Sequence, residues 1–264
     1  MTSAALVAVA RHQVNTFLAA VMFLTRVPVA SAHQFRFEDL ALSVVYFPVV
    51  GALVGLVGGI ALLTSYAMPS FLAALISMLV TLCITGGLHE DGLADCVDGL
   101  FGGQDPQRRL EIMKDSRIGT YGALALWFSL TARLILIQSL LAISVVTALL
   151  ALIVAHSLGR ASTAALLASL PYVRKGESKA SPYGNKRTHA QISIGLLFPF
   201  ILSIALLRLN GLFCVVVAVA VASACGFLFK RKIGGITGDC LGATNQLVEL
   251  ASYLSLIVLR PINA

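Results

Sequence analysis

The sequence predicts an all-α protein that crosses a membrane several times. Of its 264 residues, 58% are hydrophobic and only 12% are charged, and the mean hydropathy is +0.90. Soluble domains carry about 25% charged residues, so the composition excludes a soluble globular fold. The segments 40–88, 134–155, 190–207 and 209–229 contain no Asp, Glu, Lys, Arg or His. Runs of roughly 20 apolar residues are long enough to span a bilayer as helices.

The breaks between these apolar runs define the elements in order. An N-terminal helix is expected over 13–30, ending at Pro28; its apolar length is marginal, so it lies at the membrane interface or dips into the membrane. Pro69 marks a turn after the first span, and Asn210 with Gly211 marks a helical hairpin. About seven transmembrane helices are expected in all, over 41–64, 71–87, 120–140, 142–170, 191–208, 211–229 and 236–260.

This arrangement makes one membrane-embedded domain, 1–264, whose charged segments share a side. The stretch 120–170 is too long for one span, and as two spans it places 88–119, 171–189 and 230–232 on the same side. The opposite turns are short and nearly uncharged. By the positive-inside rule the charged side is cytoplasmic, which accounts for the net charge of +7. No surface rich in arginine and aromatic residues indicates nucleic acid as a partner.

Seven of the twelve acidic residues lie between Glu90 and Asp115. Asp91, Asp95 and Asp98 are spaced i, i+4, i+7, which puts three carboxylates on one helix face with Glu90 at its flank. Such crowding is costly near a bilayer unless a cation compensates it, and carboxylate oxygens suit Mg²⁺. We therefore expect all four acids to bind Mg²⁺; a solvated loop or a transporter's proton relay is the alternative. The glycines that would leave room for a bulky ligand are Gly86, Gly87, Gly92 and Gly99.

A basic segment, RRLEIMKDSRIGTYG (108–122), follows the acids directly. Cations beside a metal–carboxylate site neutralise charge on a phosphate or diphosphate as the bond to the leaving group breaks. Asp115 would pair with Arg117 or join the metal shell. A juxtamembrane segment that touches lipid headgroups is the alternative. The cations concerned are Arg108, Arg109, Lys114 and Arg117.

Two further polar groups lie within the predicted helices. His156 and Arg160 are one turn apart, and ionisable groups inside a membrane tend to face a polar site. They would otherwise snorkel to the cytoplasmic end, and the same ambiguity holds for Arg133. At the start of the last span, Asp239 and Asn245 would complete the metal site or bind a nucleotide or sugar hydroxyl. The alternative there is a helix cap followed by a polar interface between helices.

Five segments together resemble the cobalamin synthase family, the adenosylcobinamide-GDP ribazoletransferases of bacteria and archaea. They are FLTRVPV (23–29), YFPVVG (46–51), GGLHEDGLADCVDG (86–99), IMKDSRIGTYG (112–122) and GDCLGATNQL (238–247). The resemblance implies that adenosylcobinamide-GDP reacts with α-ribazole or its 5′-phosphate, giving adenosylcobalamin or its 5′-phosphate and GMP. It also implies Mg²⁺ as cofactor and the bacterial inner membrane as location. It leaves open a homo-oligomer or association with other corrinoid enzymes.

Under this resemblance each candidate residue has an expected role. Asp95 or Asp98 would accept the proton of an attacking 5′-hydroxyl, while Lys114, Arg117 and Arg160 would hold the leaving GMP. The metal ligands would be Glu90, Asp91, Asp95 and Asp98. The residues expected to bind substrate are Arg108, Arg109, Asp115, His156, Arg160, Asp239 and Asn245.

Two other functions compete with this one. The CDP-alcohol phosphotransferases also carry glycine-flanked aspartates on membrane helices, but the acidic block here lacks their AR pair and the later G-x3-D-x3-D. A cation- or proton-coupled transporter would place isolated acids in mid-membrane. This chain instead gathers its acids with Lys and Arg outside the long apolar runs.

Overall fold

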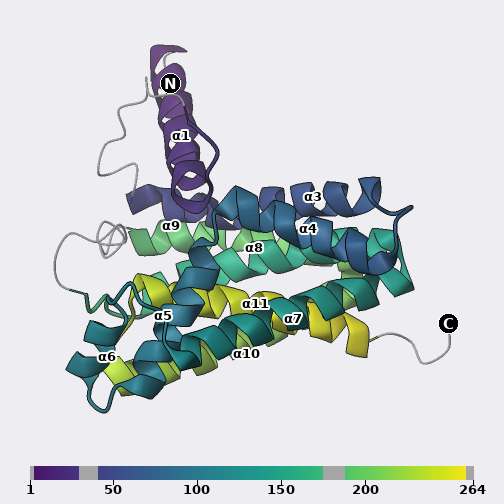
Figure 1. Ribbon diagram of the computed structural model, residues 1–264. Coiled ribbons are helices and arrows are strands. Elements are labelled where there is room, and N and C mark those ends of the chain that lie inside the picture. The colour runs from purple at the N-terminus through teal and green to yellow at the C-terminus, as the bar shows by residue number, and fades with distance from the viewer. Residues whose placement is uncertain (1–2, 30–40, 175–187, 260–264) are drawn as a thin grey trace.

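The computed structural model describes residues 3–29, 41–174 and 188–259, and the chain is all-α over these residues (Figure 1). A 3₁₀ turn at Val44–Tyr46 precedes α3, and an isolated bridge between Tyr172 and Ile236 is the only strand-like pairing in the described ranges. The all-α class is therefore confirmed. The helices are α1 (Ser3–Leu24), α3 (Phe47–Thr64), α4 (Ser70–Thr85), α5 (Leu88–Gly102), α6 (Pro106–Ile112), α7 (Thr120–Ile143), α8 (Val145–Ser169), α9 (Thr188–Gly195), α10 (Leu197–Ile233) and α11 (Gly238–Val258).

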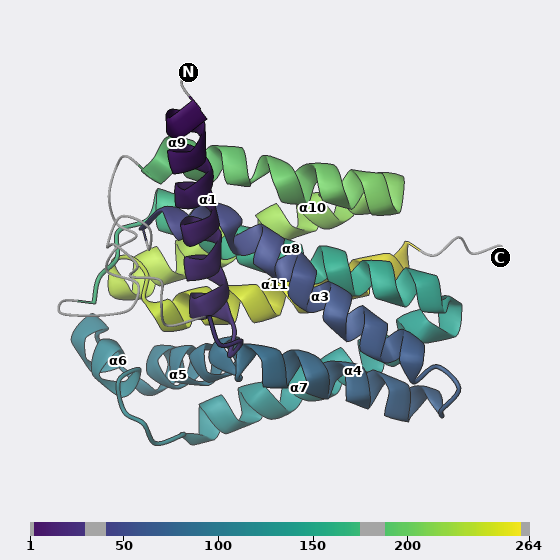
Figure 2. The same cartoon turned by 90° about the horizontal axis from the view of Figure 1, so that it is seen from above.

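The long helices run side by side, and α1 lies across one end of the bundle (Figures 1 and 2). Helix α1 begins at Ser3, earlier than the expected 13, and its crosswise direction suits a helix in the membrane plane. Five helical segments are long and apolar enough to cross a membrane, and the bent pair α4–α5 is a sixth candidate. Those five are Val7–Leu24, Ala41–Thr64, Thr120–Ile143, Val145–Ser169 and Ile192–Ile233.

The last of these segments contains two arms rather than one span. Its helical geometry is interrupted at Arg208 (φ 54°, ψ −128°), and the second arm returns along the first (Figure 2). A side chain at Gly211 would collide with the carbonyl of Ser203, so the reversal needs glycine there. The hairpin predicted around Asn210 and Gly211 is confirmed, with its break two residues earlier.

The charged segments meet at one end of the bundle, as predicted. Helices α5 and α6, the start of α7 and the junction of α10 with α11 all lie at the left of Figure 1. The turns at the opposite end join α3 to α4 and α7 to α8. Of the basic loop 171–189, residues 175–187 lie outside the described residues.

Two consecutive glycines turn the chain from α4 into α5. Gly86 (φ 67°) and Gly87 (φ 70°) both adopt the left-handed conformation, which favours glycine, and the two helices meet at 85°. A side chain at Gly86 would also collide with the side chain of Arg26. The bend directs α5 away from the line of α4, so that its acids lie at the charged end of the bundle.

A buried network of charges joins α7, α8 and α11. Glu249 lies at its centre with its side chain 1% exposed; its Oε1 is 3.0 Å from His156 Nδ1 and accepts from the Arg160 guanidinium and from Asn245 Nδ2, the latter at 2.8 Å. Arg133 Nη2 lies 3.6 Å from the other Glu249 oxygen. Buried charges persist only when they are paired and hydrogen-bonded, so these contacts fix the three helices relative to one another.

The network extends to α5 through Glu90. Arg133 Nη1 donates to Glu90 Oε1 at 3.0 Å, and Gln246 Nε2 donates to the same oxygen at 3.0 Å. Two carboxylates, Glu90 and Glu249, thus face two guanidinium groups, those of Arg133 and Arg160, and the four formal charges sum to zero.

Removing the central charge should destabilise the bundle. For Glu249→Gln we expect a loss of about 3–5 kcal/mol in the free energy of unfolding, because Arg160 and Arg133 then lack the carboxylate that compensates their burial. Thermal unfolding in detergent, followed by circular dichroism, measures the change. The matched control is Glu111→Gln, which breaks only the exposed pair with Arg108 and should leave the midpoint unchanged. Equal midpoints for both variants would contradict a structural role for the network.

Candidate active site

Three carboxylates gather where α5 crosses α11 at the charged end. A side chain at Gly92 of α5 would lie 3.2 Å from the Cα atoms of Asp239 and Gly242 on α11, so the two backbones are in close contact. Small residues are what allow helices to approach this closely. Asp91 and Asp95 flank Gly92 within one turn. The crossing therefore brings these two acids beside Asp239.

The charges of this cluster are not balanced by its own cations. Asp95 is half-buried, and burial, followed by the negative charges of Asp91 and Asp239, raises its pKa to about 7. Asp91 is exposed and Asp239 is partly buried. A carboxylate whose ionisation is opposed by two neighbouring carboxylates is stabilised by an added cation. The donor set is all carboxylate oxygen, which fits a hard divalent ion such as Mg²⁺.

Arg174 is the cation placed at this cluster. Its Nη2 donates to Asp239 Oδ2 at 2.8 Å and to the carbonyl of Met113 at 3.2 Å. The backbone fixes it there, because Val173 N donates to Ile236 O at 3.0 Å, next to the start of α11. This role of Arg174 was not predicted from the sequence. Only the presence of a cation just after α8 pointed to it, since no spacing links that position to Asp239.

Two of the four acids expected to bind the metal are engaged elsewhere. Glu90 points into the bundle and pairs with Arg133. Asp98 accepts from the backbone N–H groups of Gly119 at 2.7 Å and Gly122 at 2.8 Å, so both of its oxygens hold the first turn of α7. A side chain at Gly122 would collide with Asp98, which explains the second glycine of the GTYG sequence. The four acids therefore lie in three environments: Glu90 in the buried network, Asp98 against the start of α7, and Asp91 with Asp95 beside Asp239.

Most glycines of the acidic block are in close contact with other parts of the protein and leave no space for a ligand. Gly92 contacts α11, and a side chain at Gly99 would collide with the Met113 side chain and lie 2.7 Å from the carbonyl of Arg109. Gly86 is filled by Arg26. Only Gly87 has open space beside it. The expectation that all four leave room for a bulky ligand is therefore wrong for three of them.

The cations of the basic segment differ in their partners and in their exposure to solvent. Arg108 pairs with Glu111 on the surface, and Arg109 donates to the carbonyls of Lys232 at 3.0 Å and Gln104 at 2.9 Å, which ties α6 to the end of α10. Lys114 is exposed. These contacts give Arg109 a bridging role between helices.

Arg117 and Asp115 form the pair that the sequence suggested. Arg117 Nη2 lies 2.7 Å from Asp115 Oδ2, and hydrogen bonds from Arg117 lower the pKa of Asp115 to about 2. The pair borders a pocket of about 480 Å³ that also touches Asp98, Thr120 and Tyr121. The Arg117 side chain is 87% exposed, so it lies where a phosphate in solvent could reach it.

His156, Arg160 and Asn245 lie in the buried network and not at the surface. All three are at most 2% exposed, and Arg160 Nη2 is 3.5 Å from Nδ1 of His89 at the start of α5. These side chains lie on the buried side of the first turn of α5, so they help to hold α5, and with it the carboxylate cluster, in place. Direct contact with a substrate, expected from the sequence, would require the network to open.

No group of three or more His, Cys, Asp or Glu side chains among the described residues already stands in an arrangement that could hold a metal ion. Binding an ion between Asp91, Asp95 and Asp239 therefore requires their side chains to turn toward it. Carboxylates on single bonds change rotamer readily at a half-exposed site.

Comparison with known proteins covers nearly the whole chain. A family model described as cobalamin-5-phosphate synthase matches residues 16–257. An adenosylcobinamide-GDP ribazoletransferase of Shewanella amazonensis is 37% identical over 94% of this chain and 97% of its own length. Enzymes of the same name from Vibrio parahaemolyticus and Shewanella woodyi are 38% and 40% identical over 94% of this chain, covering 93% and 98% of their own lengths. No solved structure is a significant match. The chain therefore belongs to the cobalamin-5-phosphate synthase family, in agreement with the resemblance of its motifs.

Proposed function

We propose that this protein joins adenosylcobinamide-GDP to α-ribazole 5′-phosphate or α-ribazole, releasing GMP, as the final assembly step of the cobalamin nucleotide loop. The family match over residues 16–257 carries this proposal, together with a carboxylate cluster and an arginine at one end of a membrane bundle. The family description names a 5-phosphate product, which favours the phosphorylated acceptor. In that acceptor the 5′-oxygen is already esterified. The 5′-hydroxyl expected from the sequence to attack is therefore replaced by another free hydroxyl of the same ribose.

The reaction exchanges one bond to phosphorus for another. The ribose oxygen bonds to the phosphorus that stays on the cobinamide side chain, and the bond from that phosphorus to the bridging oxygen breaks. GMP leaves with the bridging oxygen, and the proton of the attacking hydroxyl passes to a base. We assign the base to Asp95, the half-buried carboxylate of the cluster, which can accept the proton on an oxygen that does not bind the metal.

Asp91, Asp95 and Asp239 would hold Mg²⁺ in this proposal, so that Asp239 replaces Glu90 and Asp98 of the four acids expected from the sequence. Bound there, the ion would neutralise charge on the diphosphate. Arg174 lies against Asp239, where it can donate to a phosphate oxygen of the leaving group. Lys114 and Arg117, both exposed at the same end of the bundle, would extend the positive surface toward the nucleotide.

The cluster faces the cytoplasm of a bacterial inner membrane in this proposal. The support is the position of Lys230, Arg231 and Lys232 at the end of α10 and of the basic segment around α6, all at the same end as the cluster. Positively charged segments are retained on the cytoplasmic side. Water-soluble nucleotide substrates would reach the cluster from that side.

The reaction itself can be tested with the purified protein in liposomes. Adenosylcobinamide-GDP and α-ribazole 5′-phosphate are supplied with Mg²⁺ or with EDTA, and GMP and the corrinoid product are separated by chromatography. We expect both products in equal amounts with Mg²⁺ and neither with EDTA. Turnover of CDP-alcohol substrates without corrinoid product would instead favour the lipid phosphotransferase.

The carboxylate cluster predicts a specific set of inactive variants. Asp95→Asn and Asp239→Asn should each lower kcat/KM by at least about a hundredfold, the scale on which a charged active-site group acts. Glu111→Gln, which changes an exposed acid of α6, should keep wild-type activity. Thermal midpoints measured alongside show whether each variant is folded. Near-normal activity in folded Asp95→Asn and Asp239→Asn would exclude this site.

Arg174 should affect the donor and not the acceptor. Arg174→Gln is expected to lower kcat/KM for adenosylcobinamide-GDP roughly tenfold to a hundredfold, because a hydrogen bond to a charged phosphate is lost. The KM for α-ribazole 5′-phosphate should change little. Arg231→Gln, an exposed cation at the end of α10, is the matched control. An equal effect of both substitutions would show that only the general positive field matters.

A further inference from the structure

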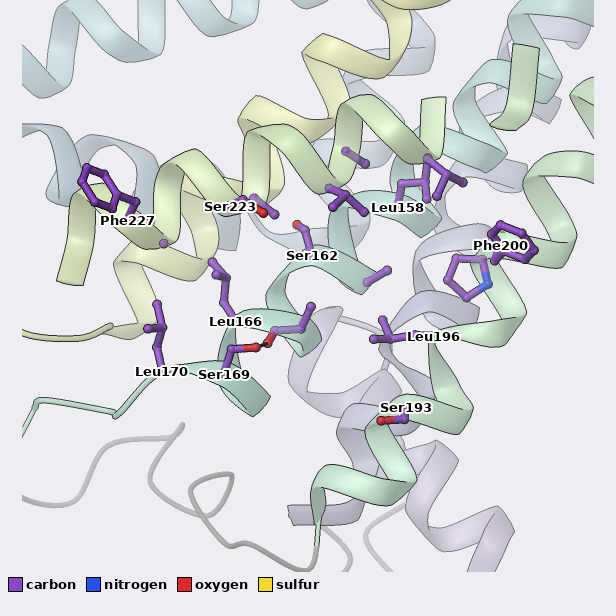
Figure 3. Close-up of a pocket in the computed structure, with 18 of the residues that line it drawn as sticks. Leu158, Ser162, Leu166, Ser169, Leu170, Ser193, Leu196, Phe200, Ser223 and Phe227 are labelled. Carbon is purple, nitrogen blue, oxygen red and sulfur yellow. Dashed lines mark hydrogen bonds between the residues drawn. The ribbon is translucent and has the colours of Figure 1, made fainter. Parts of the chain in front are cut away.

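A cavity lies away from the carboxylate cluster, between α8 and the two arms of α10. Its volume is about 640 Å³, within the usual range for ligand sites. Two stripes of side chains face each other across it, one on α8 and one on the second arm of α10. Figure 3 shows Ser162 and Leu166 of the first stripe opposite Ser223 of the second, with Phe200 of the first arm closing one side. We call this hollow the α8–α10 groove.

Small side chains create the groove. Along α8 and α10 the lining positions recur at intervals of three and four residues, so each set forms one helix face. Most positions in the middle of both faces carry small side chains, with Leu166 and Val219 between them. The small lining residues are Ala161, Ser162, Ala165, Ala218, Ala222, Ser223 and Gly226.

The walls suit a hydrocarbon chain and not a nucleotide or an amide-rich corrinoid. Ser162 Oγ donates to the carbonyl of Gly159 at 2.6 Å and Ser169 Oγ to that of Ala165 at 2.7 Å, so these hydroxyls are satisfied by their own helix. Most remaining lining atoms are apolar. A polar substrate would lose its water here without gaining hydrogen bonds, which is unfavourable.

A single cation stands at one end of the groove. Lys230 is the only charged side chain among the described residues that line it, and it lies in the last turn of α10 at the charged end of the bundle. An occupant with an apolar chain and an anionic headgroup would match both features. In a membrane-spanning bundle, such a molecule is a phospholipid whose headgroup lies at the level of Lys230.

We propose that the α8–α10 groove binds the acyl chain of one anionic phospholipid, with its phosphate headgroup on Lys230. The lipid fills the space that the small residues leave between α8 and the hairpin, so it supports the packing of α8, which carries His156 and Arg160 of the buried network. The groove contains no residue of the carboxylate cluster, so lipid binding there does not depend on the reaction assigned to that cluster.

The chain offers a sharp test because it contains one tryptophan. Trp127 lies on α7, outside the groove, with 67% of its surface exposed, and it reports contact with ordinary bilayer lipid. Phe200→Trp in a Trp127→Phe background places the reporter in the groove. Both proteins are reconstituted in phosphatidylcholine vesicles that contain a minor fraction of phosphatidylglycerol. In one set the phosphatidylglycerol carries brominated acyl chains, which quench tryptophan; in the other an equal amount of phosphatidylcholine does.

We expect brominated phosphatidylglycerol to quench the reporter at position 200 as though it were enriched roughly fivefold over its share of the vesicle, the ratio that one lysine–headgroup contact supplies. At Trp127 no enrichment is expected. Lys230→Gln should abolish the preference, whereas Arg231→Gln, the neighbouring exposed cation that does not line the groove, should keep it. Wild-type thermal midpoints confirm that each variant is folded.

Two results would overturn the proposal. Equal quenching by both brominated lipids at position 200 would show that the groove admits any acyl chain without selecting a headgroup. Quenching at position 200 weaker than at Trp127, with a dimer trapped by cross-linking, would show that a second copy of the chain covers the groove.

Discussion

The pairing of Glu249 with two arginines is the interaction on which the bundle depends. A carboxylate that is 1% exposed inside an apolar bundle is tolerated only with compensating charge, and here Arg160 and Arg133 supply it from α8 and α7. Glu90 balances the second arginine from α5. Four helices therefore have one mutual arrangement in which no buried charge is left unpaired. Sliding any of them by a turn would separate a pair inside low-dielectric surroundings, which is far more costly than shifting an apolar contact.

This constraint determines where the exposed acids can lie. Because Glu90 is drawn inward, the first turn of α5 is held against α11, and the contact of Gly92 with Gly242 follows. Asp91 and Asp95 must then point toward the end of the bundle that carries Asp239. The buried network is electrically neutral and closely packed. The carboxylate cluster at the charged end of the bundle has excess negative charge and is partly exposed to solvent. The same helix thus carries a structural carboxylate and, one residue later, one that remains available to a cation.

Apolar run lengths and turn residues predicted the hairpin, the shared charged end and the spans other than 236–260, whose helix α11 is not among the candidate membrane spans of the described residues. The i, i+4, i+7 spacing likewise predicted one acidic helix face correctly for Asp91 and Asp95. The spacing shows which side of its own helix a residue occupies and not what packs there, so it did not predict that the N–H groups of α7 donate to Asp98. Glu90 was assigned to metal for the same reason. Arg174 was missed because its position depends on backbone pairing between segments more than sixty residues apart.

The contrast between Arg117 and Arg174 shows how the fold distinguishes cations that look alike in sequence. Arg117 follows the acids closely, yet it is exposed and held by Asp115, two residues away. Arg174 is distant in sequence, but its guanidinium is bound to a carboxylate of the cluster and to a carbonyl just before Lys114. A phosphate that approaches the cluster would meet Arg174 already oriented, whereas Arg117 must first leave its partner and lose side-chain freedom. In the proposed reaction, preorganisation therefore favours Arg174 as the first contact of the diphosphate, and Arg117 would act where the nucleotide extends into solvent.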